Sequence, residues 1–432
     1  MEGESMNKIE APWGSIPDNW IISSVATEAK RVTDYVANGS FASLAENVEY
    51  KTEEDYAVLI RLVDYNNSFK GPFVFIDEKA YNFLSKSKLF GGEIIISNVG
   101  ANVGTVFLCP YLKYNMSLAP NSITVHFKGN DIFYYYWLRS KYGQHGIKSL
   151  ITGSAQPKFN KTAFRQMLIP VPPLDVQNQI AGILSSLDTK IETNNKLNEK
   201  LEEMAQAIFK SWFVDFEPFK DKPFHETELG MIPEGWEVVS LDELTSKFGT
   251  GLNPRKNFVL GHGNNYYVTI KNMNNNRIYL DDKCDKVDDE ALLKINARSK
   301  LKKGDLLFSG IGTIGRVAMV NEEPKNWNTS ESVFNMHPSK LCTSEFLYVL
   351  LLSDVFQKFV KMNALGAVQQ GIRMASLKSY TIAIPEKKVM LSFCSIIKPI
   401  VDYIQSNNEE NDRLASLRDT LLPRLMSGEL IV

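Results

Sequence analysis

The stretch IAGILSSLDTKIETNNKLNEKLEEMAQAIFKSW, residues 180–212, decides the architecture of this chain. Apolar residues recur along it at alternating intervals of four and three, which is the heptad period of a coiled coil. Two seam positions at its centre are filled by Asn194 and Asn198. An asparagine in such a seam lowers stability but fixes register, because its amide needs a polar partner. We therefore expect a helix over residues 177–213 that pairs with a second helix.

The same pattern returns near the C-terminus, over residues 393–425. Asn407 and Asn411 stand there at the seam positions that asparagines fill in the first copy. Two such helices in one chain predict an antiparallel pair in which the four asparagines face one another and fix the register. If the helices belonged separately to the cores of two domains, the heptads would be explained but the matching asparagines would not.

Three further segments occur twice, so the chain consists of two copies of one unit. The pairs are IPDNW (16–20) with IPEGW (232–236), GEIIISNVGANVG (92–104) with GDLLFSGIGTIG (304–315), and TGSAQPKFN (152–160) with LGAVQQGIR (365–373). Each copy is a globular block followed by a heptad helix. The predicted divisions are a tail (1–14), block 1 (15–172), a central helix and linker (173–231), block 2 (232–385) and a C-terminal helix (386–432).

The blocks themselves predict a mixture of short strands and helices. The expected elements are hairpin strands at 94–97 with 103–108 and at 306–309 with 317–320, and helices at 132–142 and 344–362. Glycines stand at the turns of both hairpins. The expected fold class is α+β: two homologous mixed α/β domains separated by two long helices, which form an antiparallel coiled coil with pseudo-two-fold symmetry.

The net charge of −2 conceals an uneven distribution. Block 1 has 16 Lys and Arg against 13 Asp and Glu, and block 2 has 19 against 16, whereas residues 173–232 have 6 against 11. Lysine and arginine attract the phosphates of nucleic acids. The mildly basic blocks therefore permit DNA binding without requiring it.

Several sequence signatures of catalysis are missing. No DPPY- or NPPY-like segment is present to hold a flipped base, and no GxxxxGK[ST] loop is present to bind ATP. GIGTIG, residues 310–315, matches a dinucleotide-binding pattern, but that site needs a helix behind the glycines, and RVAMV (316–320) predicts a strand. We therefore predict no catalytic residue and no cofactor bound by this chain.

The cysteines and histidines give no metal-binding pattern. Cys109, Cys284, Cys342 and Cys394 are scattered, and the five histidines stand apart from them. We expect reduced, buried thiols and no metal site. The chain has no run of 18 apolar residues, and it begins with the polar MEGESMNKIEAPWGS. These features predict a cytoplasmic protein with no membrane contact.

The order and duplication of these segments resemble the specificity subunit of type I restriction-modification systems. The resemblance covers nearly the whole chain. Besides the two IPxxW openings, it rests on GSAQPKFN (153–160), LIPVPPLDVQNQIAGILSSLDTKI (168–191), AIFKSWFVDFEP (207–218) and LLPRLMSGEL (421–430). Copy two departs in its second loop, where Gln370 and Gly371 replace Pro157 and Lys158. A contact made by Lys158 is therefore not expected in block 2.

The resemblance implies a non-catalytic subunit that recognises a bipartite, asymmetric target in double-stranded DNA. Each block would be a target-recognition domain for one half-site, and the helices would set the gap between the halves. The resemblance also implies two partner subunits that methylate adenine with S-adenosylmethionine. Restriction subunits that translocate and cleave DNA, using ATP and Mg, would complete the complex.

Candidate DNA contacts are polar residues at expected loop tips, because Arg, Lys, Asn, Gln and Ser read base edges or bind phosphates. They are Asn98, Asn102, Ser154, Gln156, Lys158 and Lys161 in block 1, and Arg255, Lys256, Lys271, Asn272, Arg316, Gln369, Gln370 and Arg373 in block 2. Both copies keep the loops at 153–160 and 366–373, so these loops could instead contact a shared methylating partner.

A second class of function fits the same pattern less well. The chain could be a coiled-coil adaptor whose two α/β blocks bind protein or glycan. The two interpretations differ in salt dependence, because phosphate contacts release counterions and weaken steeply as salt rises.

Overall fold

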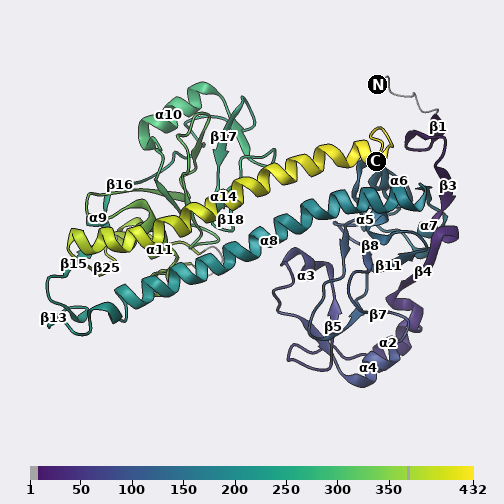
Figure 1. The fold of residues 1–432 in the computed structure, drawn as a ribbon, viewed down its shortest axis with the longest axis horizontal. Helices are drawn as coiled ribbons and strands as arrows, with labels where there is room; N and C mark the ends of the chain where they lie inside the picture. The colour runs from purple at the N-terminus through teal and green to yellow at the C-terminus, as the bar shows by residue number, and fades with distance from the viewer. Residues whose placement is uncertain (1–7, 367–369) are drawn as a thin grey trace. The chain divides into compact units, whose positions relative to one another are not determined.

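The computed structural model describes residues 8–366 and 370–432, and the chain folds into two compact units (Figure 1). Unit 1 consists of Met1–Glu192 and Asn411–Val432, and unit 2 of Thr193–Glu410. Each unit holds one block together with one half of each long helix. This division differs from the predicted sequence divisions, because both long helices run from one unit into the other.

The two long helices are α8 (Leu174–Phe213) and α14 (Lys387–Met426), each of 40 residues. The heptad seam predicted from the sequence follows the buried face of α8 near its start, where Ile180 and Leu184 are fully buried. Near the end of α8, Phe209 and Phe213 are buried, whereas the predicted seam residues Ile208 and Trp212 are only partly buried. The prolines that precede each seam lie at or just before the start of its helix, where proline is tolerated.

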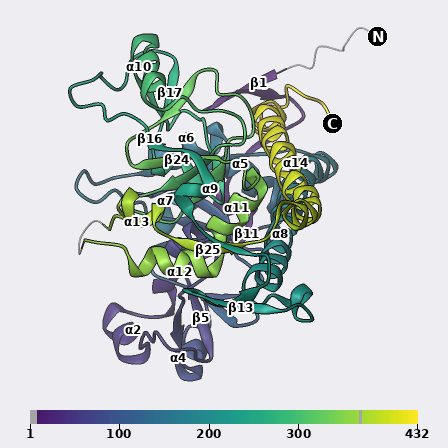
Figure 2. The ribbon, with the colours of Figure 1, turned by 90° about the vertical axis from the view of Figure 1, so that its left-hand side faces the viewer.

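The helices run antiparallel within each unit. In unit 1, Ile180 near the start of α8 shares a core with Leu425 near the end of α14. In unit 2, the rings of Phe213 at the end of α8 and Phe393 near the start of α14 lie 4.8 Å apart. Figures 1 and 2 both show the two helices alongside each other. The predicted antiparallel pairing is therefore confirmed.

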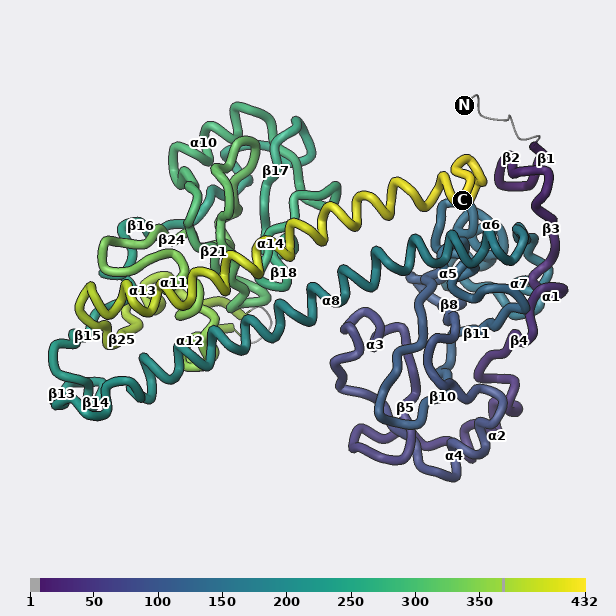
Figure 3. The backbone as a smooth tube through the Cα atoms, in the orientation of Figure 1, coloured from purple at the N-terminus to yellow at the C-terminus, as the bar shows by residue number. Residues whose placement is uncertain are grey.

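Block 1 is built on two four-stranded sheets, and it is the purple and blue part of the tube in Figure 3. Its strands are β1 (Lys8–Ala11), β2 (Gly14–Pro17), β3 (Ile21–Ser24), β4 (Ala29–Asp34), β5 (Ala57–Ile60), β6 (Val74–Ile76), β7 (Lys88–Leu89), β8 (Ile94–Ser97), β9 (Val106–Leu108), β10 (Asn115–Leu118), β11 (Ser122–Phe127) and β12 (Leu168–Val171). Its helices are α1 (Val25–Glu28), η1 (Tyr35–Asn38), α2 (Phe41–Asn47), α3 (Leu62–Asn66), α4 (Glu78–Phe83), α5 (Asp131–Arg139), α6 (Lys141–Leu150) and α7 (Lys161–Gln166).

Unit 2 contains the elements of block 2 and the connection that leads into it. The strands are β13 (Phe224–Thr227), β14 (Gly230–Pro233), β15 (Glu237–Ser240), β16 (Thr245–Thr250), β17 (Asn265–Val268), β18 (Met273–Asn274), β19 (Arg277–Ile278), β20 (Asp285–Val287), β21 (Leu306–Ser309), β22 (Val317–Met319), β23 (Trp327–Thr329), β24 (Val333–Pro338) and β25 (Thr381–Ile384). The helices are η2 (Glu217–Phe219), α9 (Leu241–Leu244), η3 (Ile270–Asn272), α10 (Asp289–Ser299), α11 (Ser344–Leu352), α12 (Asp354–Met362) and α13 (Met374–Lys378).

The main sheets of the two blocks have the same topology. Block 1 has the order β4-β11-β8-β9 and block 2 the order β16-β24-β21-β22, with every neighbouring pair antiparallel. The second sheets also agree, since β5 pairs parallel with β10 and β17 with β23. Both hairpins expected from the glycine turns are present, as β8-β9 and β21-β22. A strand follows the GIGTIG motif, as predicted.

The two predicted block helices are each divided in two. The segment expected as one helix at 132–142 consists of α5 and α6, and that at 344–362 of α11 and α12. Ser140 and Ser353 separate the halves with extended backbone, and the side chain of each caps the helix that follows. A serine N-cap offers its oxygen to unpaired N–H groups, so a new helix begins there despite continuing apolar sequence.

Residues 8–17 form a β-hairpin instead of the expected tail up to residue 14, since β1 pairs with β2. The hairpin β13-β14 stands in the same place ahead of block 2. Within the described ranges, none of the helices combines the length and apolar character that crossing a membrane requires.

Candidate nucleic-acid interface

Each block carries one pair of interlocked loops. In block 1, the glycine turn (residues 98–105, between β8 and β9) holds the clip loop (residues 152–158). Gly100 N–H donates to the carbonyl of Pro157 (2.9 Å), and Phe159 N–H donates to that of Asn98 (3.1 Å). Two reciprocal backbone hydrogen bonds between Thr152 and Lys158, of 2.8 and 2.9 Å, close the clip loop.

Block 2 repeats these contacts with different residues. Gly312 N–H donates to the carbonyl of Gln370 (2.7 Å), and Ile372 N–H donates to that of Gly310 (2.9 Å). Leu365 and Gly371 close the second clip loop by two hydrogen bonds of 2.8 Å. Backbone groups make all of these bonds, so the contacts between loop and turn are repeated while the side chains differ.

A glycine lets the first clip loop turn tightly. Gly153 has a φ of +87°, and a Cβ there would lie 2.8 Å from the carbonyl oxygen of Gln156. Residues 154–156 therefore project from a closed ring, and all three are exposed.

Most candidate DNA contacts are exposed, as a surface that meets a large ligand requires. The exposed candidates are Asn102, Ser154, Gln156, Lys158, Arg255, Lys256, Lys271, Gln370 and Arg373. Gln369 lies outside the described residues. Their amide, hydroxyl and cationic groups can donate hydrogen bonds to base edges or phosphates.

Two candidates in block 1 are engaged inside the block. The amide Nδ2 of Asn98 donates to the carbonyl of Phe159 (3.0 Å), which fastens the clip loop to the glycine turn. Lys161 Nζ lies 2.9 Å from Asp34 Oδ1 in a half-buried ion pair. Either side chain would have to give up these bonds to reach DNA.

The same holds for two candidates in block 2. Asn272 is buried, and its Oδ1 accepts from the backbone and side chain of Thr269, both at 3.0 Å. Arg316 Nη1 donates to the carbonyl of Ile270 (3.0 Å) and also to that of Met273. These side chains fix the local loop conformation.

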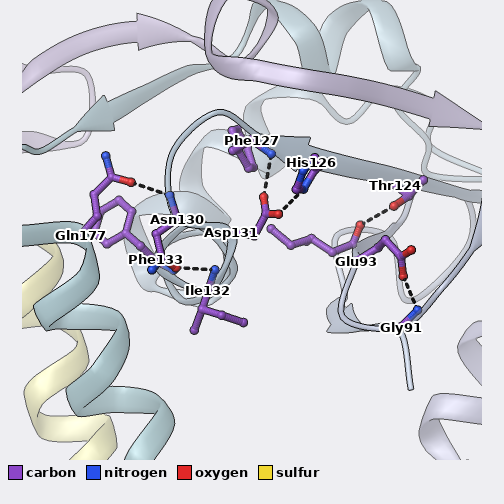
Figure 4. A network of polar contacts seen from close by, with 11 residues as sticks. Gly91, Glu93, Thr124, His126, Phe127, Asn130, Asp131, Ile132, Phe133 and Gln177 are labelled. Atoms are coloured by element: carbon purple, nitrogen blue, oxygen red, sulfur yellow. Dashed lines mark hydrogen bonds and ion pairs between the residues drawn. The ribbon is translucent and has the colours of Figure 1, made fainter. Parts of the chain in front are cut away.

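A histidine stands at the same place in both main sheets, near the end of β11 and of β24. His126 pairs with Asp131, which also accepts from Phe127 N–H (2.6 Å), as Figure 4 shows. His337 pairs with Asp305. Burial raises the pKa of both aspartates above the ordinary value, and the histidines only partly oppose this.

Block 1 is attached to its helix pair by polar contacts that the sequence analysis missed. Asn130 N–H donates to Gln177 Oε1 of α8 at 2.9 Å (Figure 4). The hydroxyl of Tyr136 donates to Asp188 Oδ2 (2.6 Å), and Arg418 of α14 donates to Asp188 Oδ1 (2.6 Å). Arg418 occupies a heptad seam position, and a charged residue on an apolar seam was the available signal.

The hairpin β18-β19 of block 2 makes polar contacts with both helices of its pair. Asn276 Nδ2 donates to Glu202 of α8 (3.0 Å), and Arg277 Nη2 donates to the carbonyl of Asn408 in α14 (3.3 Å). Asn275 and Asn276 both have positive φ, as a tight two-residue hairpin turn needs. The run NNNR at 274–277 was the sequence signal for this turn.

The seam asparagines form a polar layer within unit 2. Asn407 Nδ2 donates to Asn198 Oδ1 (2.8 Å), and Asn198 Nδ2 donates to Asn408 Oδ1 (3.0 Å). Asn194 donates to Glu410 (2.7 Å). Asn411, in unit 1, is buried. The structure thus brings Asn198 and Asn407 together, and the role of the four asparagines in setting register stays a prediction.

All four cysteines are buried and free. Burial raises the pKa of the Cys284 thiol to about 11 and that of Cys342 to about 12, so both are protonated near neutral pH. Within residues 8–366 and 370–432, no group of three His, Cys, Asp or Glu side chains is arranged to hold a metal ion.

Comparison with protein families gives a match over most of the chain. Residues 33–203 and 233–415 both match the model described as "Type I restriction modification DNA specificity domain". The two matches correspond to the two copies of the repeat.

Individual relatives cover the chain almost from end to end. The MjaIX specificity subunit of a type I restriction enzyme from Methanocaldococcus jannaschii is 25% identical over 98% of this chain and 96% of its own length. The EcoBI specificity subunit of Escherichia coli is 24% identical over 96% and 87%. The crystal structure of a type I restriction-modification S subunit from M. genitalium has a TM-score of 0.54 at 14% identity, covering 98% and 97%, so it shares the fold.

Proposed function

Because the chain belongs to the type I restriction-modification DNA specificity family, we propose that it selects the DNA sequence on which partner enzymes act. The repeated pair of loops carries this proposal. Both blocks hold a clip loop on a glycine turn by the same backbone bonds, while the side chains exposed on the loops differ. Two domains with the same loop arrangement but different exposed side chains suit a bipartite, asymmetric target. The adaptor hypothesis is not favoured, since the family match covers both blocks.

Within each block, cationic and amide side chains have different roles. Exposed cations such as Lys158 and Arg373 bind phosphates, and exposed amides such as Gln156 and Gln370 read base edges. The internally bonded residues hold the loops in shape. The chain itself then needs no catalytic group: it contributes recognition.

The proposed partners are double-stranded DNA, two methyltransferase subunits and restriction subunits. S-adenosylmethionine, ATP and Mg would be bound by these subunits and not by this chain. The specificity-subunit names of the relatives support a place in such a complex.

Mapping methylated adenines across the host genome, with and without this chain, tests the proposal. We expect one two-part sequence to lose methylation when the chain is deleted and to regain it on complementation. Methylation that is unchanged, or that has no sequence preference, would contradict it. Salt gives a second check, because binding through phosphates weakens steeply as salt rises.

The helix pair is proposed to set the gap between the half-sites. Inserting one heptad into both helices keeps the seam in phase and lengthens each by about 10 Å, at about 1.5 Å per residue. The gap in the methylated sequence should then grow by roughly three base pairs, at ~3.4 Å each. Adding the same number of residues after Val432 should leave the gap in the methylated sequence unchanged. An unchanged gap in the helix variant would rule out this role.

A further inference from the structure

Block 1 contains a cavity of about 650 Å³ beside its glycine turn. The residues that line it include Tyr35 of η1, Phe41 of α2, Tyr50, Asn98 and Asn121. Phe41 is 82% exposed and Tyr50 is 53% exposed, although both are large aromatic side chains. Exposed apolar side chains that gather around a hollow are typical of a binding site.

The cavity also offers a hydrogen-bond acceptor. Asn98 uses its Nδ2 for Phe159, but its buried Oδ1 has no hydrogen-bond partner. A buried acceptor without a partner costs free energy, and a ligand that donates a hydrogen bond would satisfy it once the Asn98 side chain turns toward the cavity. Aromatic faces together with one amide acceptor fit a flat ring that carries N–H groups.

Two lysines are bonded to residues that line the cavity. Val99 lines the cavity and forms a backbone bridge with Lys158, whose side chain is exposed. Lys161 pairs with Asp34, which also lines the cavity, and so offsets the negative charge of that carboxylate.

Block 2 cannot build the same cavity. By strand register, Gly251 stands where block 1 has Tyr35, and Gly310 stands where block 1 has Asn98. A Cβ on Gly251 would lie 1.7 Å from the carbonyl oxygen of Thr329, and one on Gly310 would lie 2.4 Å from the ring of Phe334. Two of the side chains that line the cavity, Tyr35 and Asn98, therefore have no counterpart in block 2.

The restriction of the cavity to block 1 indicates which kind of ligand it binds. A partner protein that docks on both blocks would use features that they share, such as the clip loops. A cavity confined to one block fits a ligand that only this block binds. Under the proposed function, that ligand is its own DNA half-site. We propose that the block 1 cavity takes up one unstacked nucleobase of the bound DNA, with its ring against Phe41 and its edge on Asn98 Oδ1. This inference rests on the proposed function.

A double-mutant cycle between protein and DNA tests the proposal in the assembled methyltransferase complex. Phe41→Ala is measured against duplexes of the mapped target that each lack one base at a different position. Stacking on one aromatic side chain is worth roughly 10-fold in affinity, so the variant should bind the intact duplex about 10-fold more weakly. That loss should vanish at a single abasic position, because the two changes remove the same contact.

Two matched variants separate this contact from general damage. Phe90→Ala removes another exposed phenyl ring of block 1, outside the cavity, and should bind every duplex like the parent protein. Phe41→Trp keeps a stacking face and should retain affinity and the same abasic signature.

Three results would overturn the inference. Phe41→Ala could bind like the parent, or lose affinity equally on every abasic duplex. It could also weaken assembly with the methyltransferase in the absence of DNA, which would assign the cavity to a partner protein. These results leave selective binding by the parent intact and so differ from failure of the proposed function, in which the parent complex itself shows no sequence preference.

Discussion

Block 1 and block 2 share a sheet order and a pair of interlocked loops, yet they differ at the position beside the glycine turn. Asn98 stands there in block 1, with an amide that ties down the clip loop. Gly310 stands there in block 2, under the ring of Phe334. The shared part is made by backbone hydrogen bonds, and the divergent part by side chains and glycines. The frame can therefore be kept while the surface it presents changes.

The blocks also differ in how each is tied to the helix pair of its own unit. In unit 1 the tie is a carboxylate, Asp188, shared by Tyr136 and Arg418. In unit 2 it is a hairpin that reaches Glu202 and Asn408. Different residues attach each block to its helices, so a substitution can remove the contacts of one block without changing those of the other.

The largest expected effect comes from giving block 2 a side chain where only glycine fits. Gly251→Ala should lower the free energy of unfolding by about 3 kcal/mol, because the new Cβ would overlap the carbonyl oxygen of Thr329. Denaturant unfolding measures this. Gly249→Ala is the matched control, since no heavy atom lies within 4 Å of its Cβ. Equal stability of the two variants would show that block 2 has room for a side chain like Tyr35.

The polar layer gives the next largest effect. Asn198→Leu should destabilise the protein by about 2 kcal/mol, because the buried amide of Asn407 loses its acceptor. Adding Asn407→Leu should recover part of the loss, since two apolar groups then face each other. Thermal unfolding of the single and double variants tests this. A double variant no more stable than Asn198→Leu alone would refute it.

Removing the tie of block 1 should have a smaller and local effect. Arg418→Met should cost about 1 kcal/mol, because Asp188 keeps its bond from Tyr136 but loses that from the cation. Hydrogen exchange should quicken in α5 of block 1 and stay unchanged in α11 of block 2. Arg413→Met, at an exposed position of α14, is the control. Faster exchange in both blocks would mean that the tie is not specific to block 1.

The smallest effect concerns the two buried aspartates. Burial raises the pKa of both Asp131 and Asp305, so each unfolded carboxyl ionises at a lower pH than the folded one. Their contribution to stability is present below about pH 4 and is lost as the pH rises through the folded pKa. Asp131→Asn and Asp305→Asn should therefore gain stability relative to the parent as the pH rises from 4 to 7. Melting temperatures across that range measure this, with the exposed Asp282→Asn as control. A relative gain as the pH falls would contradict the sign.

The elements that follow a period or a turn rule were predictable from sequence. The heptad seam, the antiparallel pairing and both glycine-turn hairpins depend on local spacing, and all are present. The division of the block helices at Ser140 and Ser353 was missed, because the apolar pattern continues across each serine while its side chain starts a new helix. For the candidate DNA contacts, the sequence indicated which polar residues lie in loops. It did not indicate which of their side chains face solvent and which bond within their own block. Lys161 and Arg316 have the expected chemistry and are bonded within their blocks. The cavity is lined by residues that are far apart in the sequence, so no local sequence pattern predicts it.

Exchanging one block tests the central claim most directly. Residues 233–385 are replaced by the matching segment of another family member with a known target, and methylated adenines are mapped with the same partner subunits. We expect one half of the two-part target to change to the half read by the donor block while the other half stays. A target that is unchanged, or altered in both halves, would contradict the claim that each block reads its own half-site.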